Sequence, residues 1–393
     1  MNLREQALKL HKDNKGKLAV KSKVTVATKE DLSLVYTPGV AEVCREIAQN
    51  KDLVYDYTMK PNAVAVVTDG SAVLGLGNIG PEAALPVMEG KSILFKELAD
   101  IDAFPICLNT QDEDEIISIV KNIAPVFGGI NLEDISAPKC FRIERELQDI
   151  GIPVMHDDQH GTAIVILAAL INAAKVLGKT IDDIKVVING AGAAGLAVAK
   201  LLECHGIDEK MCISVKEIIV CDTKGIIYDG RSDLNEYKKE LAKYTNRMKR
   251  KGTLQDALKG ADAFIGLSKG NLLKADDLRV MNKNAIVFAM ANPVPEISYD
   301  EAIKVAKVVG TGRSDFPNQI NNSLVFPGVF RGALDAKAIR INDTMKIAAA
   351  HALAGCINPT VDNILPYTLD KGVVLKIAEA VRRKAVETGV VRK

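Results

Sequence analysis

The hydrophobic positions of the chain form short continuous runs, separated by longer segments in which apolar and polar residues mix with a helical period. The runs at residues 63–68, 185–189 and 217–222 are typical of buried strands. The segments at residues 112–123 and 161–177 predict helices. Strands that alternate with helices along a chain usually pair in parallel, so the pattern predicts an α/β fold.

The chain has 393 residues, which is too long for one hydrophobic core and favours two domains. The apolar run at residues 152–155 is followed by polar residues and then by a long helical segment, and the first half of the chain ends here. We therefore expect an α/β domain over residues 1–158 and a second α/β domain over residues 159–393. Repeated strand–helix units predict a Rossmann-type doubly wound parallel sheet in the second domain.

Two pairs of acidic residues follow predicted strands in the first domain. Glu133 and Asp134 follow one apolar run, and Asp157 and Asp158 follow the next. Loops at the carboxyl ends of strands bind ligands in α/β folds, and carboxylates are ligands that hard divalent cations prefer. The two pairs therefore indicate a metal or substrate site. The alternative is that Asp157 and Asp158 only cap the helix that follows them.

A glycine-rich turn marks the start of the second sheet. The run at residues 185–189 leads into the sequence GAGAAG and a predicted helix, and the next strand ends in an acid. This spacing places a pyrophosphate at a helix N-terminus and the acid beside the adenosine ribose. The residues expected to bind a dinucleotide are Gly190, Gly192, Ala193, Ala194, Gly195 and Asp222. A second such motif, Gly75–Gly80, is weaker because no acid ends the strand after it.

Lys91 and Tyr36 are candidates for proton transfer. The helical pattern before Lys91 ends at Gly90, so we expect Lys91 at a helix start, where the helix dipole would depress the pKa of its amine. Tyr36 precedes a Thr-Pro-Gly turn and is expected on a loop. The structural alternatives are an exposed Lys91 with its ammonium in water and a Tyr36 that packs with a wet hydroxyl.

The composition excludes several kinds of partner. Lys and Arg number 51, Asp and Glu number 50, and Trp is absent, so we expect no nucleic acid and no membrane surface as a partner. No apolar run is long enough to span a bilayer without interruption, and the N-terminus lacks the apolar core of a secretory signal. The seven cysteines include no CxxC pair, so we expect free thiols in a reduced, cytoplasmic setting.

Taken together, the motifs resemble the malic enzyme family in its short bacterial form. They follow the family's order and span most of the chain. The matching blocks lie at residues 35–39, 68–70, 74–80, 90–91, 132–134, 156–162, 190–195, 291–293, 321–322 and 326–328. The resemblance implies that the first domain binds substrate and metal, and that the second binds NAD, with NADP possible.

The resemblance implies the oxidative decarboxylation of L-malate to pyruvate and CO₂ with reduction of NAD(P)⁺, in a homodimer. Lys91 matches the family's general base, and Tyr36 matches its general acid. Asp157 matches an acid beside the lysine that orients and tunes it. One residue would take the proton of the C2 hydroxyl, and the other would deliver a proton to C3.

The resemblance also implies a set of ligand contacts. Glu133, Asp134 and Asp158 match the ligands of Mg²⁺ or Mn²⁺, which suits three hard oxygen donors. Asn292 and Asn322 match amides that contact the substrate or the nicotinamide.

Two points of the resemblance stay open. Larger family members carry an Arg that grips a substrate carboxylate, and this chain has Ala72 there, with Arg313 as a conceivable substitute. Asp222 favours NAD because it would repel a 2′-phosphate, although Lys224 lies close enough in sequence to offset that repulsion.

Two other kinds of protein share parts of this pattern. A metal-independent two-domain dehydrogenase of amino acids or hydroxy acids would use a lysine base without the acid pairs. A non-catalytic dinucleotide sensor would bind NAD(H) and turn over no hydroxy acid. Dependence of malate oxidation on Mn²⁺ distinguishes the malic enzyme prediction from both.

Overall fold

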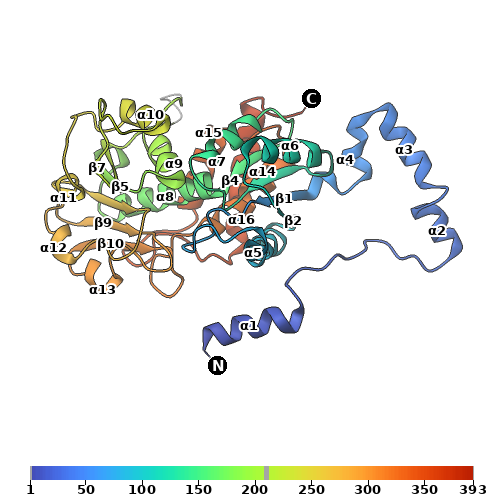
Figure 1. The fold of residues 1–393 in the computed structure, drawn as a ribbon, viewed down its shortest axis with the longest axis horizontal. Coiled ribbons are helices and arrows are strands. Elements are labelled where there is room, and N and C mark those ends of the chain that lie inside the picture. Colours follow the sequence, from blue (N-terminus) through green and yellow to red (C-terminus); the bar gives the residue numbers. More distant parts are fainter. Residues whose placement is uncertain (1, 208–211, 393) are drawn as a thin grey trace.

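The computed structural model describes residues 2–207 and 212–392. Figure 1 shows a body that contains two sheets covered by helices, and an N-terminal arm, residues 2–57, that extends away from the body. Helices and mainly parallel strands alternate throughout the body, so the predicted α/β class with two sheets is confirmed.

The first sheet contains four parallel strands in the order β2-β1-β3-β4. The strands are β1 (Ala63–Thr68), β2 (Asp102–Cys107), β3 (Gly129–Leu132) and β4 (Val154–His156). The helices between them are α5 (Pro81–Ala99), α6 (Glu113–Ile123) and α7 (Lys139–Glu146). Leu132 pairs with Val67 on one side and with His156 on the other, so neighbouring strands end at the same edge. The two acid pairs that follow β3 and β4 therefore lie side by side.

The second sheet has the order β10-β9-β8-β5-β6-β7. Its strands are β5 (Lys185–Asn189), β6 (Glu217–Asp222), β7 (Gly225–Ile226), β8 (Ala263–Gly266), β9 (Ala285–Ala289) and β10 (Ala306–Thr311). Its helices are α9 (Ala193–Leu202), α10 (Glu236–Tyr244), α11 (Leu254–Leu258), α12 (Ala275–Leu278) and α13 (Tyr299–Ala302). The strands are parallel as predicted, except that the short β7 pairs antiparallel with β6.

The C-terminal helices pack back onto the first sheet. They are α14 (Phe326–Asp335), α15 (Asp343–Ala354) and α16 (Lys371–Glu387). The ring of Phe95 in α5 meets Phe326 at 4.7 Å and Phe330 at 5.4 Å between centroids, both edge to face. Aromatic pairs in this geometry stabilise a core beyond the burial of their area. The last helices of the chain thus close the core of its first half.

Helix α8 (Asp157–Val176) lies between the two sheets and packs against α9 and α15. By length and composition it is the one described helix that could cross a membrane, which corrects the expectation that no segment would qualify. However, 72% of its apolar window is buried inside the protein. A helix buried on all sides reads as continuously apolar because it has no solvent face. The boundary expected after Asp158 falls within its first turn, and the division into domains stays a proposal.

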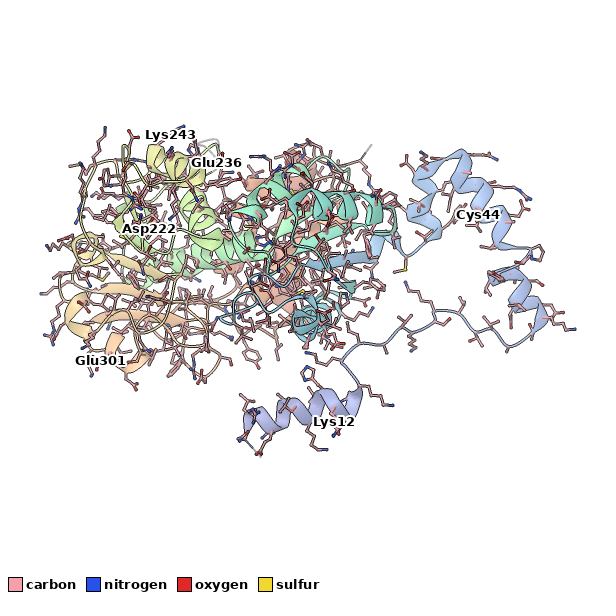
Figure 2. All side chains as sticks on the ribbon, in the orientation of Figure 1. Lys12, Cys44, Asp222, Glu236, Lys243 and Glu301 are labelled. Atoms are coloured by element: carbon pink, nitrogen blue, oxygen red, sulfur yellow. A yellow bond between two sulfur atoms is a disulfide. The ribbon has the colours of Figure 1, made fainter. Side chains whose placement is uncertain are left out.

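The arm carries four short helices, α1 (Leu3–Asn14), α2 (Lys29–Val35), α3 (Val40–Gln49) and α4 (Val54–Tyr57). None of the residues of these helices is buried, and Figure 2 shows Cys44 far from the sheets. The end of α1 lies closer, because Lys17 donates to Pro86 O of α5 at 2.8 Å. Single 3-10 turns occur at Lys51–Leu53, Lys60–Asn62, Ala124–Val126, Ile181–Asp183 and Asn322–Leu324.

Helix α5 is longer than predicted. The sequence favoured a break at Gly90 with a new helix at Lys91, but the structure has one continuous helix through both positions. Its inner face buries Ala84, Met88 and Phe95, and this packing overrides the low helix propensity of the Pro and Gly within it. Lys91 therefore lies in the interior of a helix, and the prediction that a helix N-terminus depresses its pKa is wrong.

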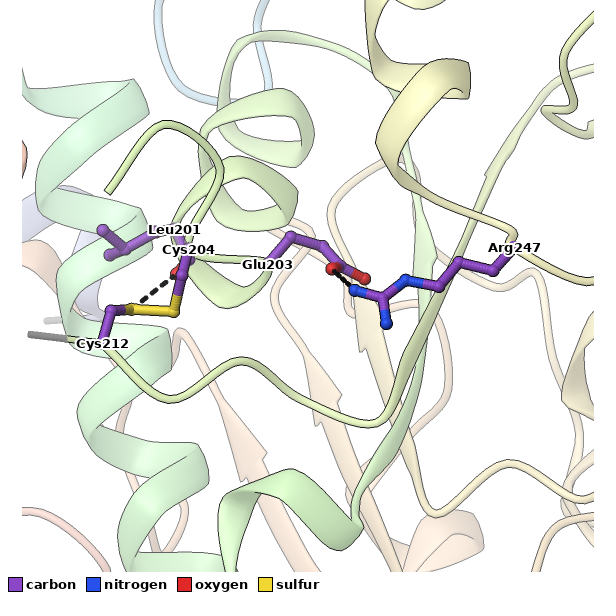
Figure 3. The surroundings of a disulfide bond; sticks show 5 residues. All are labelled: Leu201, Glu203, Cys204, Cys212 and Arg247. Carbon is purple, nitrogen blue, oxygen red and sulfur yellow. Dashed lines mark hydrogen bonds and ion pairs between the residues drawn. A yellow bond between two sulfur atoms is a disulfide. The ribbon is translucent and has the colours of Figure 1, made fainter. Parts of the chain in front are cut away.

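Two cysteines form a disulfide, which the sequence did not predict. Cys204 follows α9, Cys212 lies on the segment that leads to β6, and their Cα atoms are 5.8 Å apart (Figure 3). Next to the bridge, Arg247 pairs with the buried carboxylate of Glu203 at 2.6 Å. The expectation of free thiols is thus wrong for this pair and holds for the other five cysteines.

Candidate active site

A cleft of about 740 Å³ runs between the two sheets. It brings together side chains from the carboxyl ends of strands in both sheets, as expected for ligand sites in this fold class. Residues that line it include Ala72, Gly75, Lys91, Glu133, Asp134, Asp158, Ala194, Ser268, Asn292, Asn322 and Phe326. Three of the four paired acids, the candidate base, the start of the glycine turn's helix and both amides predicted from the sequence therefore share one site.

Three carboxylates form a compact cluster at the floor of the cleft. Glu133, Asp134 and Asp158 each offer an oxygen, and these atoms lie within 4.8 Å of one another. The backbone N–H of Asp134 donates to Asp158 Oδ2 at 2.8 Å, and Asp134 adopts a positive φ of 54° that turns its side chain into the cluster. The buried Asp134 Oδ2 has no hydrogen-bond partner. An unpartnered buried oxygen beside two other carboxylates is suited to a cation.

The electrostatics of the cluster also favour a cation. Burial raises the pKa of all three carboxyl groups, neighbouring carboxylates add to the increase, and Lys91 opposes it. The pKa of Asp134 rises to about 9. Protons would otherwise neutralise such a crowded site, and a divalent cation can take their place. The hard oxygen donors fit Mg²⁺ or Mn²⁺.

Lys91 lies directly beside this cluster. Its Nζ forms an ion pair with Glu133 Oε1 at 2.9 Å, contacts Asp157 Oδ2, and lies 4.0 Å from the centroid of the Phe326 ring. Burial lowers the pKa of the Lys91 amine, but Asp157 and Glu133 outweigh that effect and raise it. Lys91 is neither exposed nor depressed in pKa; it is the buried counter-ion of the acid cluster.

Asp157 is held in place from two sides. Its side chain is fully buried, and one oxygen contacts Lys91. Gly161 lies one turn after Asp157 on α8, and a Cβ built on it would lie 1.8 Å from Asp157 Oδ1. Only glycine at this position leaves room for the carboxylate. His156 precedes α8 as its N-cap residue, and neither acid is the cap. The structure therefore disfavours the interpretation that Asp157 and Asp158 only cap the helix.

A supporting residue that the sequence analysis missed is Glu144 on α7. It accepts hydrogen bonds from the His156 backbone at 3.1 Å, from Gln159 Nε2 at 3.2 Å and from the ring of His160 at 2.9 Å. Glu144 thus fixes the turn that carries Asp157 and Asp158. The signal in the sequence is weak, because one acid on the inner face of a short helix resembles any other helical acid.

The glycine turn of the second sheet has the geometry that a dinucleotide requires. A Cβ on Gly195 would lie 1.8 Å from Gly190 O, and Gly190 has a φ of 126° and lies against Leu267 O. Gly192 is the N-cap residue of α9, whose first residues are Ala193 and Ala194. The backbone N–H groups at this N-terminus are therefore free of bulky side chains and can receive a pyrophosphate.

Asp222 at the end of β6 forms ion pairs with two basic side chains. Its Oδ2 accepts from Arg231 Nη2 at 2.5 Å and from Lys238 Nζ at 2.7 Å, and its Oδ1 accepts from the Lys224 backbone at 2.9 Å. Burial opposes ionisation, but these hydrogen bonds outweigh it and lower the pKa of Asp222. The carboxylate is thus ionised but balanced by charge, which the sequence alone did not show.

Comparisons with known proteins agree with this geometry. Residues 14–148 match the family description "Malic enzyme, N-terminal domain", and residues 159–386 match "Malic enzyme, NAD binding domain". A bifunctional malic/malolactic enzyme of Bacillus subtilis is 56% identical over 100% of this chain and 95% of its own length. The chain belongs to the malic enzyme family.

Solved structures of malic enzymes share the fold closely. The NAD-dependent malic enzyme from Thermotoga maritima is 49% identical, with a TM-score of 0.91 over 96% of this chain and 98% of that one. The malic enzyme from Pyrococcus horikoshii is 48% identical, with a TM-score of 0.92 over 100% of this chain and 92% of that one. Membership of the malic enzyme family makes the chain an oxidoreductase, as the sequence motifs predicted.

The predicted acid, Tyr36, is not among the residues that line the cleft. Tyr36 lies at the C-terminal end of α2 in the arm, and 67% of its surface is exposed. The alternative, in which Tyr36 packs against the protein with a wet hydroxyl, is also not observed, because most of the residue is exposed and α2 has no buried residue.

One open point concerned how the substrate carboxylate is held. Ala72 lines the cleft as expected, but Arg313 forms an exposed ion pair with Asp315 at 2.5 Å and is not among the residues that line it. Asn292 instead approaches the other sheet: a Cβ on Gly75 would lie 2.0 Å from Asn292 O. The Gly75–Gly80 loop thus allows close approach of the two halves of this malic enzyme.

Proposed function

We propose that this member of the malic enzyme family converts L-malate to pyruvate and CO₂ with reduction of NAD⁺ or NADP⁺, and that it requires Mg²⁺ or Mn²⁺. The observation that carries the proposal is the cluster of Glu133, Asp134 and Asp158 beside Lys91, in a cleft that also contains the start of α9. A metal-independent dehydrogenase would have no need for three clustered carboxylates at this place, two of them buried.

The three carboxylates would hold the cation by one oxygen each. When bound, a divalent cation would polarise the C2 oxygen of the substrate and stabilise the negative charge that develops on it. Lys91 contacts two carboxylates that raise its pKa, and positive charge placed at the cluster would lower that pKa again. The bound cation would thereby favour the neutral amine of Lys91, which can accept a proton.

The proton transfers can be assigned to two residues of the chain. Lys91 Nζ takes the proton of the C2 hydroxyl while the C2 hydrogen leaves as hydride to the nicotinamide. The C3–C4 bond then breaks, CO₂ departs, and the electron pair remains on the enolate of pyruvate. Tyr36 returns a proton to C3. Asp157 stays ion-paired with Lys91 and holds its amine at the reacting oxygen.

For the dinucleotide, the paired state of Asp222 supports the use of both NAD⁺ and NADP⁺, with only a modest preference for NAD⁺. The ribose hydroxyls can donate to the carboxylate, while Arg231 and Lys238 offset its repulsion of a 2′-phosphate. Lys238→Met should therefore lower kcat/KM for NADP⁺ more than for NAD⁺. An equal loss of kcat/KM with both cofactors would contradict the proposal that Lys238 offsets the repulsion of the 2′-phosphate.

For the assembly, we propose a homodimer in which the arm of one subunit lies on the body of the other. The arm exposes Leu32, Leu34, Val35 and Val40 to solvent in the single chain, and none of the residues of α2 or α3 is buried. Short helices depend on packing of an apolar face for their stability. A second copy of the chain would supply that packing and would receive Tyr36 at its own cleft.

Mixing two inactive variants tests where Tyr36 acts. Tyr36→Phe and Lys91→Met should each lower turnover by about 10²–10⁴-fold. If each site takes Lys91 from one subunit and Tyr36 from the other, a heterodimer has one intact site. Random mixing of the two variants should then restore about a quarter of the wild-type activity, from the statistics of a two-fold symmetric dimer. No recovery after confirmed subunit exchange would place both residues in the same subunit.

The proposed reaction is tested by NAD(P)H formation from L-malate after exhaustive removal of metal. We expect no activity in excess chelator, recovery with Mn²⁺ or Mg²⁺, and pyruvate formed in equal amount to NAD(P)H. Full activity in the chelator would point to the metal-independent dehydrogenase. Dinucleotide binding without turnover under any metal would point to the sensor.

A further inference from the structure

One buried acid of the second domain has no part in the proton transfers. Glu296 follows β9 by a few residues and is completely buried. Within the described residues, no Lys, Arg or His side chain forms an ion pair with it. A buried carboxylate without a cation is costly unless hydrogen bonds satisfy its oxygens. The partners of Glu296 therefore indicate what it does.

Both carboxylate oxygens accept from the backbone of the cleft wall. Glu296 Oε1 accepts from the N–H of Ser268 at 3.0 Å, and Oε2 accepts from the N–H of Ala291 at 3.0 Å. Ser268 lies on the loop after β8, and Ala291 lies on the loop after β9. Both residues line the cleft. One side chain thus ties together two loops that come from neighbouring strands.

The glycine that ends β8 shows how closely the carboxylate is fitted. A Cβ on Gly266 would lie 2.3 Å from Glu296 Cδ and 2.6 Å from each carboxylate oxygen. Any larger residue at Gly266 would have to displace the carboxylate. The backbone carbonyl of Glu296 also accepts from the N–H groups of Leu272 and Leu273, at 2.8 and 3.0 Å. The whole residue is therefore fixed between the two strands.

The two loops that Glu296 joins touch the rest of the active site. Ser268 Oγ accepts from Asn189 Nδ2 at 2.8 Å. Asn189 immediately precedes the glycine turn that would bind the pyrophosphate. Asn292 follows Ala291 directly and lies against Gly75 of the other sheet. A shift of Glu296 would therefore move the wall of the dinucleotide site and the amide next to it together.

We propose that Glu296 is a positioning residue that sets the affinity for the dinucleotide by holding the loops after β8 and β9 at their spacing. This proposal rests on the proposed function, since it takes the cleft as the place where nicotinamide and malate meet. Glu296 touches neither ligand and acts through Ser268 and Ala291. The acid cluster for the cation lies in the other sheet and does not depend on it.

The test is the Glu296→Gln variant, which keeps the shape of the side chain but places an NH₂ group against one of the two backbone N–H donors. Loss of one hydrogen bond to a buried charged group should weaken NADH binding by about tenfold or more. The dissociation constant is measured by NADH fluorescence without malate. Mn²⁺ binding should be unchanged, and so should the secondary structure by circular dichroism.

The matched control is Glu301→Gln on α13, a half-exposed acid five positions further along that Figure 2 labels at the edge of the molecule. It should bind NADH like the wild type. Equal NADH affinity in Glu296→Gln and Glu301→Gln would overturn the proposal. Failure of the wild type to oxidise malate would count against the proposed function alone, because the NADH measurement needs no turnover.

A second variant covers the case in which Glu296→Gln does not fold. Gly266→Ala places a methyl group against the carboxylate and should weaken NADH binding in the same way. If both changes act through one contact, the double variant should bind NADH little more weakly than either single variant. A fold-loss of NADH affinity in the double variant that equals the product of the two single fold-losses would contradict a shared mechanism.

Discussion

Asp134→Asn should abolish malate oxidation and, at the same time, make the metal-free protein more stable at alkaline pH. Asp134 Oδ2 is buried without a hydrogen-bond partner, so an amide of the same shape disturbs little around it. Removal of residues that only support metal ligands typically costs 10–100-fold, so loss of a ligand should exceed about 100-fold in turnover. Dinucleotide binding should remain, because it depends on the other sheet.

The stability effect follows from the sign of the pKa shift. Burial and the neighbouring carboxylates raise the pKa of Asp134 to about 9, above its value in the unfolded chain. The folded protein therefore holds this proton more tightly, and the contribution of Asp134 to stability falls as the pH rises towards 9. Asparagine does not titrate. The difference in melting temperature between the variant and the metal-free wild type should thus grow from pH 5 to pH 9.

Added Mn²⁺ should make the wild type more stable than Asp134→Asn. At a hundred times its dissociation constant a ligand stabilises the folded state by about 2.7 kcal/mol, and only the wild type retains the full site. The exposed Asp229→Asn serves as the control and should show neither effect. An Asp134→Asn protein that keeps both its turnover and its stabilisation by Mn²⁺ would exclude the acid cluster as the metal site.

Lys91→Met should remove hydride transfer from malate, with a loss of about 10²–10⁴-fold or more in the first turnover. The change also leaves Asp157 and Glu133 buried without their cation, so part of any loss would reflect altered structure. Lys91→Arg separates the two effects, because arginine keeps the positive charge but does not give up its proton. Both variants should therefore be inactive, and the arginine variant should retain more stability.

Exchange of solvent protons into the methyl group of pyruvate provides an independent readout. We expect Lys91→Met to lower the rate of malate oxidation by a larger factor than the rate of this exchange. Tyr36→Phe should slow the exchange specifically. Lys96→Met, on the same helix and half-exposed, is the control and should behave as the wild type. If Lys91→Arg oxidised malate at the wild-type rate, the base would have to be another group.

The sequence predicted the sheets well because their strands are buried. The stretches Ala63–Val67 and Val186–Ile188 are apolar at every position, which is typical of parallel strands covered on both faces. The placement of the acid pairs was also predictable, since parallel strands end at one edge. What the sequence could not give was the environment of Lys91, because the carboxylates that raise its pKa lie at least 42 positions away in the chain.

Two local rules failed where tertiary packing competed with them. Pro86 and Gly90 lower helix propensity, yet the buried face of α5 keeps the helix continuous. Glu144 and Glu296 escaped notice for a different reason. Their partners include backbone N–H groups from segments distant in the sequence, and a backbone donor leaves no mark in the amino-acid sequence.

Helix α8 has a consequence for how the protein is built. It supplies Asp157 and Asp158 to the first sheet from its first turn, and its remaining turns pack within a core that includes residues of both sheets, such as Val64 and Ile188. The C-terminal helices add to the same core through Phe326. The two segments at residues 14–148 and 159–386 therefore cannot be separated without exposing the interior of each. Their unfolding is expected to be one cooperative event, and a gene cut between them would yield two insoluble halves.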